Sequence, residues 1–132
     1  MANQANPWAS EQMPASIKWA VAGVWLHAVL NGIGALVLFG IATDPYGSDA
    51  GLLRLLAALS LLIAVLLAVC AALAPRRAGW TRATVLVIEW LGIISGLLLL
   101  FTGAVASLAG LAVSVLIVGA YTSNAGRSWF DR

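Results

Sequence analysis

Four long apolar runs dominate the sequence, and each is long enough to cross a lipid bilayer as a helix. A helix rises about 1.5 Å per residue, so crossing the hydrocarbon core takes about 20 apolar residues. The runs cover Ile17–Ile41, Leu52–Ala74, Ala83–Phe101 and Ala104–Tyr121. We therefore predict an all-α, polytopic membrane protein in which residues 1–132 form one domain, a compact bundle of four transmembrane helices.

Turn-forming residues separate these runs. Residues 44–49 read Asp-Pro-Tyr-Gly-Ser-Asp, and Pro75 follows the second run at a point where proline stops a helix. Only Thr102 and Gly103 separate the third run from the fourth. Such a short connection predicts that the last two helices are antiparallel neighbours.

The composition agrees with a membrane protein and excludes several other classes. Hydrophobic residues make up 62% of the chain and charged residues 9%, whereas soluble domains have roughly 45–50% and roughly 25%. One cysteine and one histidine exclude an internal disulfide and the usual multi-ligand zinc site. We expect no metal and no cofactor. The basic residues are scattered, which also argues against nucleic-acid binding.

The distribution of basic residues predicts the orientation of the helices. Six of the seven lysines and arginines fall on one side of the membrane, which the positive-inside rule assigns to the cytoplasm. They are Lys18, Arg76, Arg77, Arg82, Arg127 and Arg132. Arg54 falls on the other side, where we expect it to pair with Asp49 or with a lipid phosphate; the alternative is a gating ion pair. Both termini are therefore expected in the cytoplasm.

Tryptophans lie near the predicted cytoplasmic ends of the helices, where the membrane interface favours them. They are Trp8, Trp19, Trp80 and Trp129. The segments 6–8 and 127–132 carry aromatic residues and are expected to lie on the membrane surface. The alternative is that these segments dock a partner.

Each predicted helix also carries small or polar residues at three- and four-residue spacing. In a membrane such residues allow helices to approach closely, so they predict the packing faces. The stripes are Ala20, Gly23, His27, Asn31 and Gly34; Ala57, Ser60, Ala64, Ala68 and Ala71; Gly92, Gly96 and Gly103; and Ser107, Gly110, Ser114 and Tyr121.

Glu89 and His27 are the most informative polar residues. Glu89 lies seven residues after Arg82 and His27 nine residues after Lys18, so helical geometry places them roughly 10 Å and roughly 14 Å into their spans. An ionised side chain at this depth is costly unless it faces protein or water. Both helices run outward from the cytoplasm, so we predict that the two side chains meet inside the bundle.

This pair has two interpretations. It holds the helices together, at roughly 0.5–2 kcal/mol per hydrogen bond, or it is a proton-binding or acid–base site. In the second interpretation Glu89 and His27 are candidate catalytic residues, and Asn31, Trp25 and Trp90 are candidate substrate-binding residues. The alternative for Asn31 is a role as a hydrogen-bond donor in helix packing, and for the two tryptophans it is the filling of volume.

Two stretches resemble a known group of proteins. They are residues 82–92, Arg-Ala-Thr-Val-Leu-Val-Ile-Glu-Trp-Leu-Gly, followed by Gly96, and residues 126–130, Gly-Arg-Ser-Trp-Phe. Together with six arginines to one lysine, they resemble small uncharacterised four-helix integral membrane proteins of high-GC actinobacteria. The resemblance implies the plasma membrane as the location and implies no activity.

Three functions are consistent with the sequence. The first is an accessory or interaction protein that packs through its small-residue faces against another membrane subunit or a second copy of itself. The second is a proton-linked carrier or channel for a small solute that uses Glu89 and His27. The third is an integral membrane enzyme for a lipidic or apolar substrate, with the same two residues as acid and base. Whether the chain is an enzyme at all stays open.

Overall fold

The computed structural model describes residues 12–43 and 49–131, and this part of the chain is helical apart from its turns. The elements are α1 (Ala15–Ala42), α2 (Ala50–Leu73), the one-turn 3₁₀ helix η2 (Ala74–Arg76), α3 (Gly79–Phe101), α4 (Ser107–Thr122) and α5 (Asn124–Phe130). Three helices, α1, α2 with η2, and α3, are long and apolar enough to span a membrane. Helices α4 and α5 meet this condition only together, and they are bent by 65° at their junction. The all-α prediction is confirmed for the described residues, and three or four helices have the length and apolar composition of membrane spans.

The third helix starts earlier than its apolar run. It begins at Gly79, four residues before Ala83, because the polar residues after Gly79 complete its first turns. Thr81 is buried, and its hydroxyl donates a hydrogen bond of 2.6 Å to the carbonyl oxygen of Ala78 just before the helix. An apolar run therefore marks the lipid-facing part of this helix rather than its true start.

The fourth helix starts later than predicted. It begins at Ser107 instead of Ala104, because Gly103 has a φ of 86° and residues 104–106 form a turn. A left-handed glycine ends a helix readily, since it has no Cβ to clash. Gly103 therefore lies in the turn, and the prediction that it continues the packing face of α3 was wrong.

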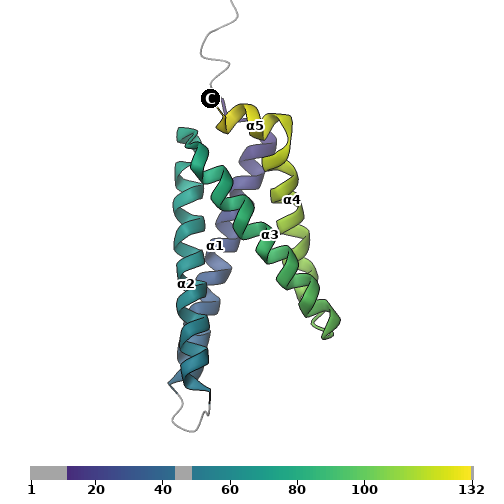
Figure 1. Cartoon of the computed structure of the whole chain (residues 1–132). Helices are drawn as coiled ribbons and strands as arrows, with labels where there is room; N and C mark the ends of the chain where they lie inside the picture. The colour runs from purple at the N-terminus through teal and green to yellow at the C-terminus, as the bar shows by residue number, and fades with distance from the viewer. Residues whose placement is uncertain (1–11, 44–48, 132) are drawn as a thin grey trace, which may run out of the picture.

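The helices form two consecutive hairpins, α1 with α2 and α3 with α4 (Figure 1). The hairpins meet at the end that carries α5 and diverge toward the opposite end. The bundle is consequently less compact at the diverging end than we predicted. The starts of α1 and α3 and the end of α2 all lie at the α5 end, which gathers most of the basic residues there.

Alanines at seven-residue spacing form the contact within the first hairpin. The buried alanines with this spacing are Ala28, Ala35 and Ala42 in α1, and Ala57, Ala64 and Ala71 in α2. A repeat of seven keeps small side chains on one side of each helix, which lets two helices pack closely. At Gly32 an added Cβ would lie 4.0 Å from the Cβ of Ala64, so the backbones are near one another. The predicted small-residue face of the second span is confirmed.

The outer faces of the long helices are apolar. Large side chains such as Leu36, Leu52 and Leu98 are more than half exposed. A continuous apolar surface of this kind is unfavourable in water and matches the hydrocarbon core of a bilayer.

Helix α5 folds back across one end of the bundle and closes it (Figure 1). Phe130 stacks on Tyr121, with ring centroids 5.1 Å apart. The indole N–H of Trp129 donates a 2.9 Å hydrogen bond to the carbonyl oxygen of Ala74, at the end of α2. Because Trp129 and Phe130 are both buried, this part of the tail does not lie on the surface as we predicted. Instead it belongs to the core.

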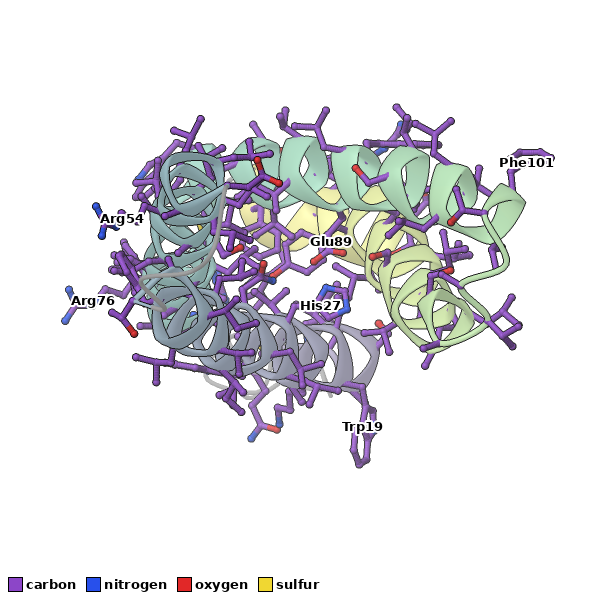
Figure 2. The ribbon with its side chains drawn as sticks, turned by 90° about the horizontal axis from the view of Figure 1, so that it is seen from below. Trp19, His27, Arg54, Arg76, Glu89 and Phe101 are labelled. Carbon is purple, nitrogen blue, oxygen red and sulfur yellow. The ribbon has the colours of Figure 1, made fainter. Side chains whose placement is uncertain are left out.

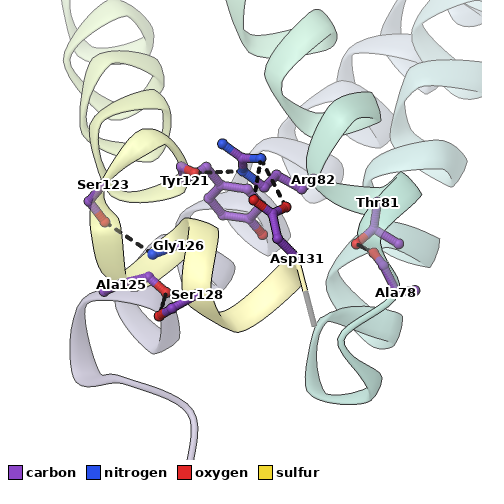
Figure 3. A network of polar contacts seen from close by, with 9 residues as sticks. All are labelled: Ala78, Thr81, Arg82, Tyr121, Ser123, Ala125, Gly126, Ser128 and Asp131. Carbon is purple, nitrogen blue, oxygen red and sulfur yellow. Dashed lines mark hydrogen bonds and ion pairs between the residues drawn. The ribbon is translucent and has the colours of Figure 1, made fainter.

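A polar network fixes this closure (Figure 3). The Arg82 Nε donates to the carbonyl oxygen of Tyr121 at 2.9 Å, and its Nη1 forms an ion pair with Asp131 at 3.2 Å. The Arg77 guanidinium lies 4.1 Å from the centroid of the Trp129 ring. Two of the basic residues that predicted the cytoplasmic side thus also hold α5 in place.

The remaining boundary predictions have mixed outcomes. Trp19 and Trp80 are exposed near the α5 end, as expected for interfacial side chains. Trp8, the segment 6–8 and Arg132 lie outside the described residues. Within the described part of the chain, Arg54 forms no ion pair with Asp49. Figure 2 shows Arg54 pointing away from the interior.

Candidate functional site

The predicted contact between His27 and Glu89 is confirmed. The Nδ1 atom of His27 lies 3.0 Å from Oε1 of Glu89, so the two side chains form a hydrogen-bonded pair between α1 and α3. Glu89 is only 1% exposed, while the side chain of His27 is 14% exposed. Seen from below, both point from their helices into the space enclosed by the bundle (Figure 2). The carboxyl group is thus hidden from lipid by the protein itself.

Helical phase accounts for the position of Glu89. Val85 and Gly96, one turn before and two turns after it, are also buried. At Gly96 an added Cβ would lie 2.8 Å from Cγ of Leu111, which shows that this face of α3 is pressed against α4. At Gly92 the nearest atom would be Oγ of Ser114, at 3.6 Å. The predicted face of Glu89, Gly92 and Gly96 is therefore the face that packs against α4.

Asn31 lies one turn beyond His27 on the same side of α1. Its Nδ2 donates a 2.9 Å hydrogen bond to the backbone carbonyl of His27. This hydrogen bond therefore joins two residues of α1, the Asn31 side chain and the His27 backbone. It does not bridge to another helix through this bond, which differs from the packing role considered above.

A cavity of about 460 Å³ lies beside the pair, and all four long helices contribute to its wall. Its size is in the range of small-molecule sites. The residues around it are His27, Leu30, Asn31, Ile63, Leu67, Ile88, Glu89, Leu91, Gly92, Ser95, Gly96, Leu99, Ser107, Gly110, Leu111 and Ser114. The wall is mostly apolar, with a few polar groups around one acid and one base.

Three serines of this wall were not predicted as site residues. Ser107 and Ser114 stood in the small-residue stripe of the fourth span, and their spacing of seven residues on one helix was the available signal. The Ser107 hydroxyl bonds to the carbonyl of Ala104 at 2.8 Å, and the Ser95 hydroxyl to that of Leu91 at 2.8 Å. The Ser107 hydroxyl also lies 3.3 Å from the carbonyl oxygen of Gly96 on α3, and these hydroxyls give the cavity a mildly polar wall.

Trp25 and Trp90, the two tryptophans predicted as substrate contacts, do not line this cavity. They are 45% and 52% exposed and lie on outer faces of α1 and α3. Of the five predicted site residues, the structure brings His27, Glu89 and Asn31 together and leaves the tryptophans outside.

A second cavity, of about 510 Å³, lies between α1 and α4. It is almost entirely apolar, and its wall includes Trp19, Gly23, Leu26, Leu116 and Ile117. Gly23 matters here because a Cβ at this position would lie 3.2 Å from Ile117. None of the described residues around this cavity is ionisable, so we do not assign chemistry to it.

Fold and site together define a helical protein with three or four helices apolar enough to span a membrane, and with a hydrogen-bonded Glu89–His27 pair in the wall of a cavity between the helices. No group of three His, Cys, Asp or Glu side chains able to hold a metal ion occurs in residues 12–43 and 49–131. Comparison of the chain with models of protein families, with curated proteins and with solved structures found no match.

Proposed function

We propose that this protein is a proton-linked carrier for a small solute, with the solute bound beside Glu89 and His27. The observation that carries this proposal is the position of the pair in the wall of a cavity large enough for a small molecule. A pair that served only to join two helices would have no need of adjoining space. Here the histidine keeps partial exposure toward that space.

The chemistry of the pair supports proton linkage. An imidazole ring nitrogen can bind and release a proton, and a carboxylate at hydrogen-bond distance can accept or return the same proton. Gain or loss of that proton changes the charge of the cavity wall by one unit. A bound solute that favours one of the two charge states is therefore thermodynamically linked to the proton.

The arrangement of the hairpins supports access from one side. They diverge away from α5, while Tyr121, Trp129 and Phe130 close the α5 end. In carriers, one helical unit rocks against another around a central site. Rocking of α1–α2 against α3–α4 about the His27–Glu89 contact would alternate access to the cavity. We place the α5 end and both termini in the cytoplasm, and the protein in a bacterial plasma membrane.

A second candidate function is that of an accessory protein, and the apolar cavity between α1 and α4 favours it. Its apolar wall would receive side chains from one helix of another membrane subunit. Co-purification of one stoichiometric membrane subunit in mild detergent, lost when Gly23 is replaced by Leu, would support this function. Retention of that subunit by the Gly23→Leu variant would count against it.

The carrier function is tested in proteoliposomes with an imposed pH gradient. A pH-sensitive dye inside the vesicles reports proton movement as small amines, carboxylates or alcohols are added outside. Wild-type protein should accelerate solute-dependent proton movement, and Glu89→Gln vesicles should behave as empty ones. Val87→Ala is the matched control, since Val87 lies on α3 with an outward side chain. Wild-type vesicles that match empty vesicles for every solute would refute the proposal.

A further inference from the structure

Among the described residues, the wall of the site cavity contains one carboxyl group, one imidazole and otherwise uncharged side chains. Oε1 of Glu89 bonds to His27, and within the described residues no further hydrogen bond reaches this carboxyl group. Among the described residues of this wall, the charge therefore depends on how many protons the pair holds, to which the charge of a bound solute is added.

The pair has three charge states. With neutral imidazole and ionised carboxylate its net charge is −1; one added proton makes it neutral, and a second makes it +1. A net charge within a low-dielectric interior is costly, so site and solute together favour neutrality. For an empty cavity, the neutral state is the one with one added proton. A bound monovalent cation favours the state without it.

A bound anion would require the state with two added protons. That state replaces a hydrogen bond between oppositely charged groups with a weaker one, because the acceptor becomes a neutral carboxylic acid. The cation instead leaves the carboxylate ionised and the imidazole N–H as its donor. Of the two charged solute types, the cation preserves the stronger contact.

We propose, building on the carrier function above, that the solute is a small organic monocation with an apolar body, and that it exchanges for one proton. The cationic group lies against the Glu89 carboxylate, and the proton that leaves the pair passes to the aqueous medium. The apolar body packs against the leucine and isoleucine side chains that all four long helices contribute to the wall. A cavity of about 460 Å³ accommodates one aromatic ring with a short cationic substituent.

Three probes that share one ring test this inference: benzyltrimethylammonium, benzyl alcohol and benzoate. Binding to the detergent-solubilised full chain is measured by titration calorimetry in two buffers of different ionisation enthalpy, which yields the number of protons released. The cation carries a fixed charge, so any pH dependence of its binding belongs to the protein. The expected results are release of one proton per cation and an apparent Kd that rises about tenfold per unit fall in pH, where the pair is protonated. Benzyl alcohol and benzoate should bind at least tenfold more weakly.

Equal binding of benzoate or benzyl alcohol, or cation binding without proton release, would overturn the cation assignment. Absence of binding by all three probes at millimolar concentration would also overturn it. In each of these cases the proteoliposome assay, with its wider range of solutes, still decides the carrier function separately. The wild-type protein alone gives these answers, so they do not depend on a variant that folds.

Variants then test whether Glu89 is responsible for the proton release and for the preference for the cation. Glu89→Gln keeps the shape of the side chain and should abolish both proton release and the preference for the cation, while benzyl alcohol binding changes less than twofold. Val87→Ala should bind all three probes as the wild type does. A Glu89→Gln protein that still releases a proton on cation binding would place the exchange elsewhere.

Discussion

His27 and Glu89 lie 62 residues apart, each in the first helix of one of two consecutive hairpins, and their side chains meet at 3.0 Å. The pair therefore joins the two hairpins within the interior of the molecule. The same offset of 62 residues also aligns Gly34 with Gly96. Only Gly96 is pressed against a neighbouring helix, whereas a Cβ at Gly34 would meet nothing within 4 Å. The two hairpins are thus alike in direction and differ in packing.

The close contact of α3 with α4 predicts different effects of alanine at two helical glycines. Gly96→Ala should lower the free energy of unfolding by about 1–3 kcal/mol, because its Cβ would overlap Leu111. Gly119→Ala should raise it by up to about 1 kcal/mol, since it meets nothing within 4 Å and alanine favours a helix. Unfolding in mixed detergent micelles, followed by circular dichroism, measures both. Similar effects of the two substitutions would contradict the packing described.

The fold of α5 depends on the absence of a side chain at residue 126. A Cβ there would lie 2.5 Å from the carbonyl oxygen of Ala120 and 2.6 Å from that of Tyr121, and backbone atoms cannot move aside. Gly126→Ala should therefore displace α5 and speed up tryptic cleavage after the exposed Arg127. Ser128→Ala is the control, since the Ser128 hydroxyl bonds only to the carbonyl of Ala125 in the same helix. Cleavage at equal rates in both variants would show that α5 tolerates a Cβ.

The contacts of Arg82 predict an asymmetry between the two members of its ion pair. Asp131 is exposed, so Asp131→Asn should change the free energy of unfolding by less than about 1 kcal/mol. Arg82→Ala should lower it by about 1–3 kcal/mol, because it also removes the donor to the carbonyl oxygen of Tyr121. Denaturation of both variants under the same conditions checks this order. A larger loss of stability in Asp131→Asn than in Arg82→Ala would show that the ion pair contributes more than the hydrogen bond to Tyr121.

The orientation in the membrane is tested by cysteine labelling in intact cells. Cys70 is buried and is replaced by Ala to provide a cysteine-free background. In that background, Thr102→Cys in the α3–α4 turn should react with a membrane-impermeant maleimide added outside. Ser128→Cys in α5 should react only after the cells are permeabilised. The opposite pattern would invert the topology derived from the basic residues.

Much of the fold is predictable because lipid imposes simple rules on sequence. The length of each apolar run predicted a membrane-spanning helix. The carboxyl group of Glu89 was expected to face protein because its exposure to lipid is costly. The phase of Glu89 with Gly92 and Gly96 then identified the packing face of α3. These inferences rest on local chemistry and on helical geometry.

Features that depend on tertiary contacts were not predictable in this way. Trp129 reads as an interfacial residue, yet its indole N–H finds the carbonyl of Ala74, which is 55 residues distant in the chain. Helix α4 starts later than predicted because Gly103 has a left-handed conformation, which the periodicity of the sequence does not reveal. The cavity itself arises from the divergence of the hairpins, and no single segment encodes it.

The contact of Glu89 with His27 is tested most directly by a double-mutant cycle. Glu89→Leu, His27→Leu and the double variant are unfolded in mixed micelles, and their losses in stability are compared. Each single substitution leaves one polar partner unsatisfied, so the double variant should be more stable than the sum of the single losses implies, by about 0.5–2 kcal/mol. Losses that add to within about 0.3–0.5 kcal/mol would show that the two side chains do not interact.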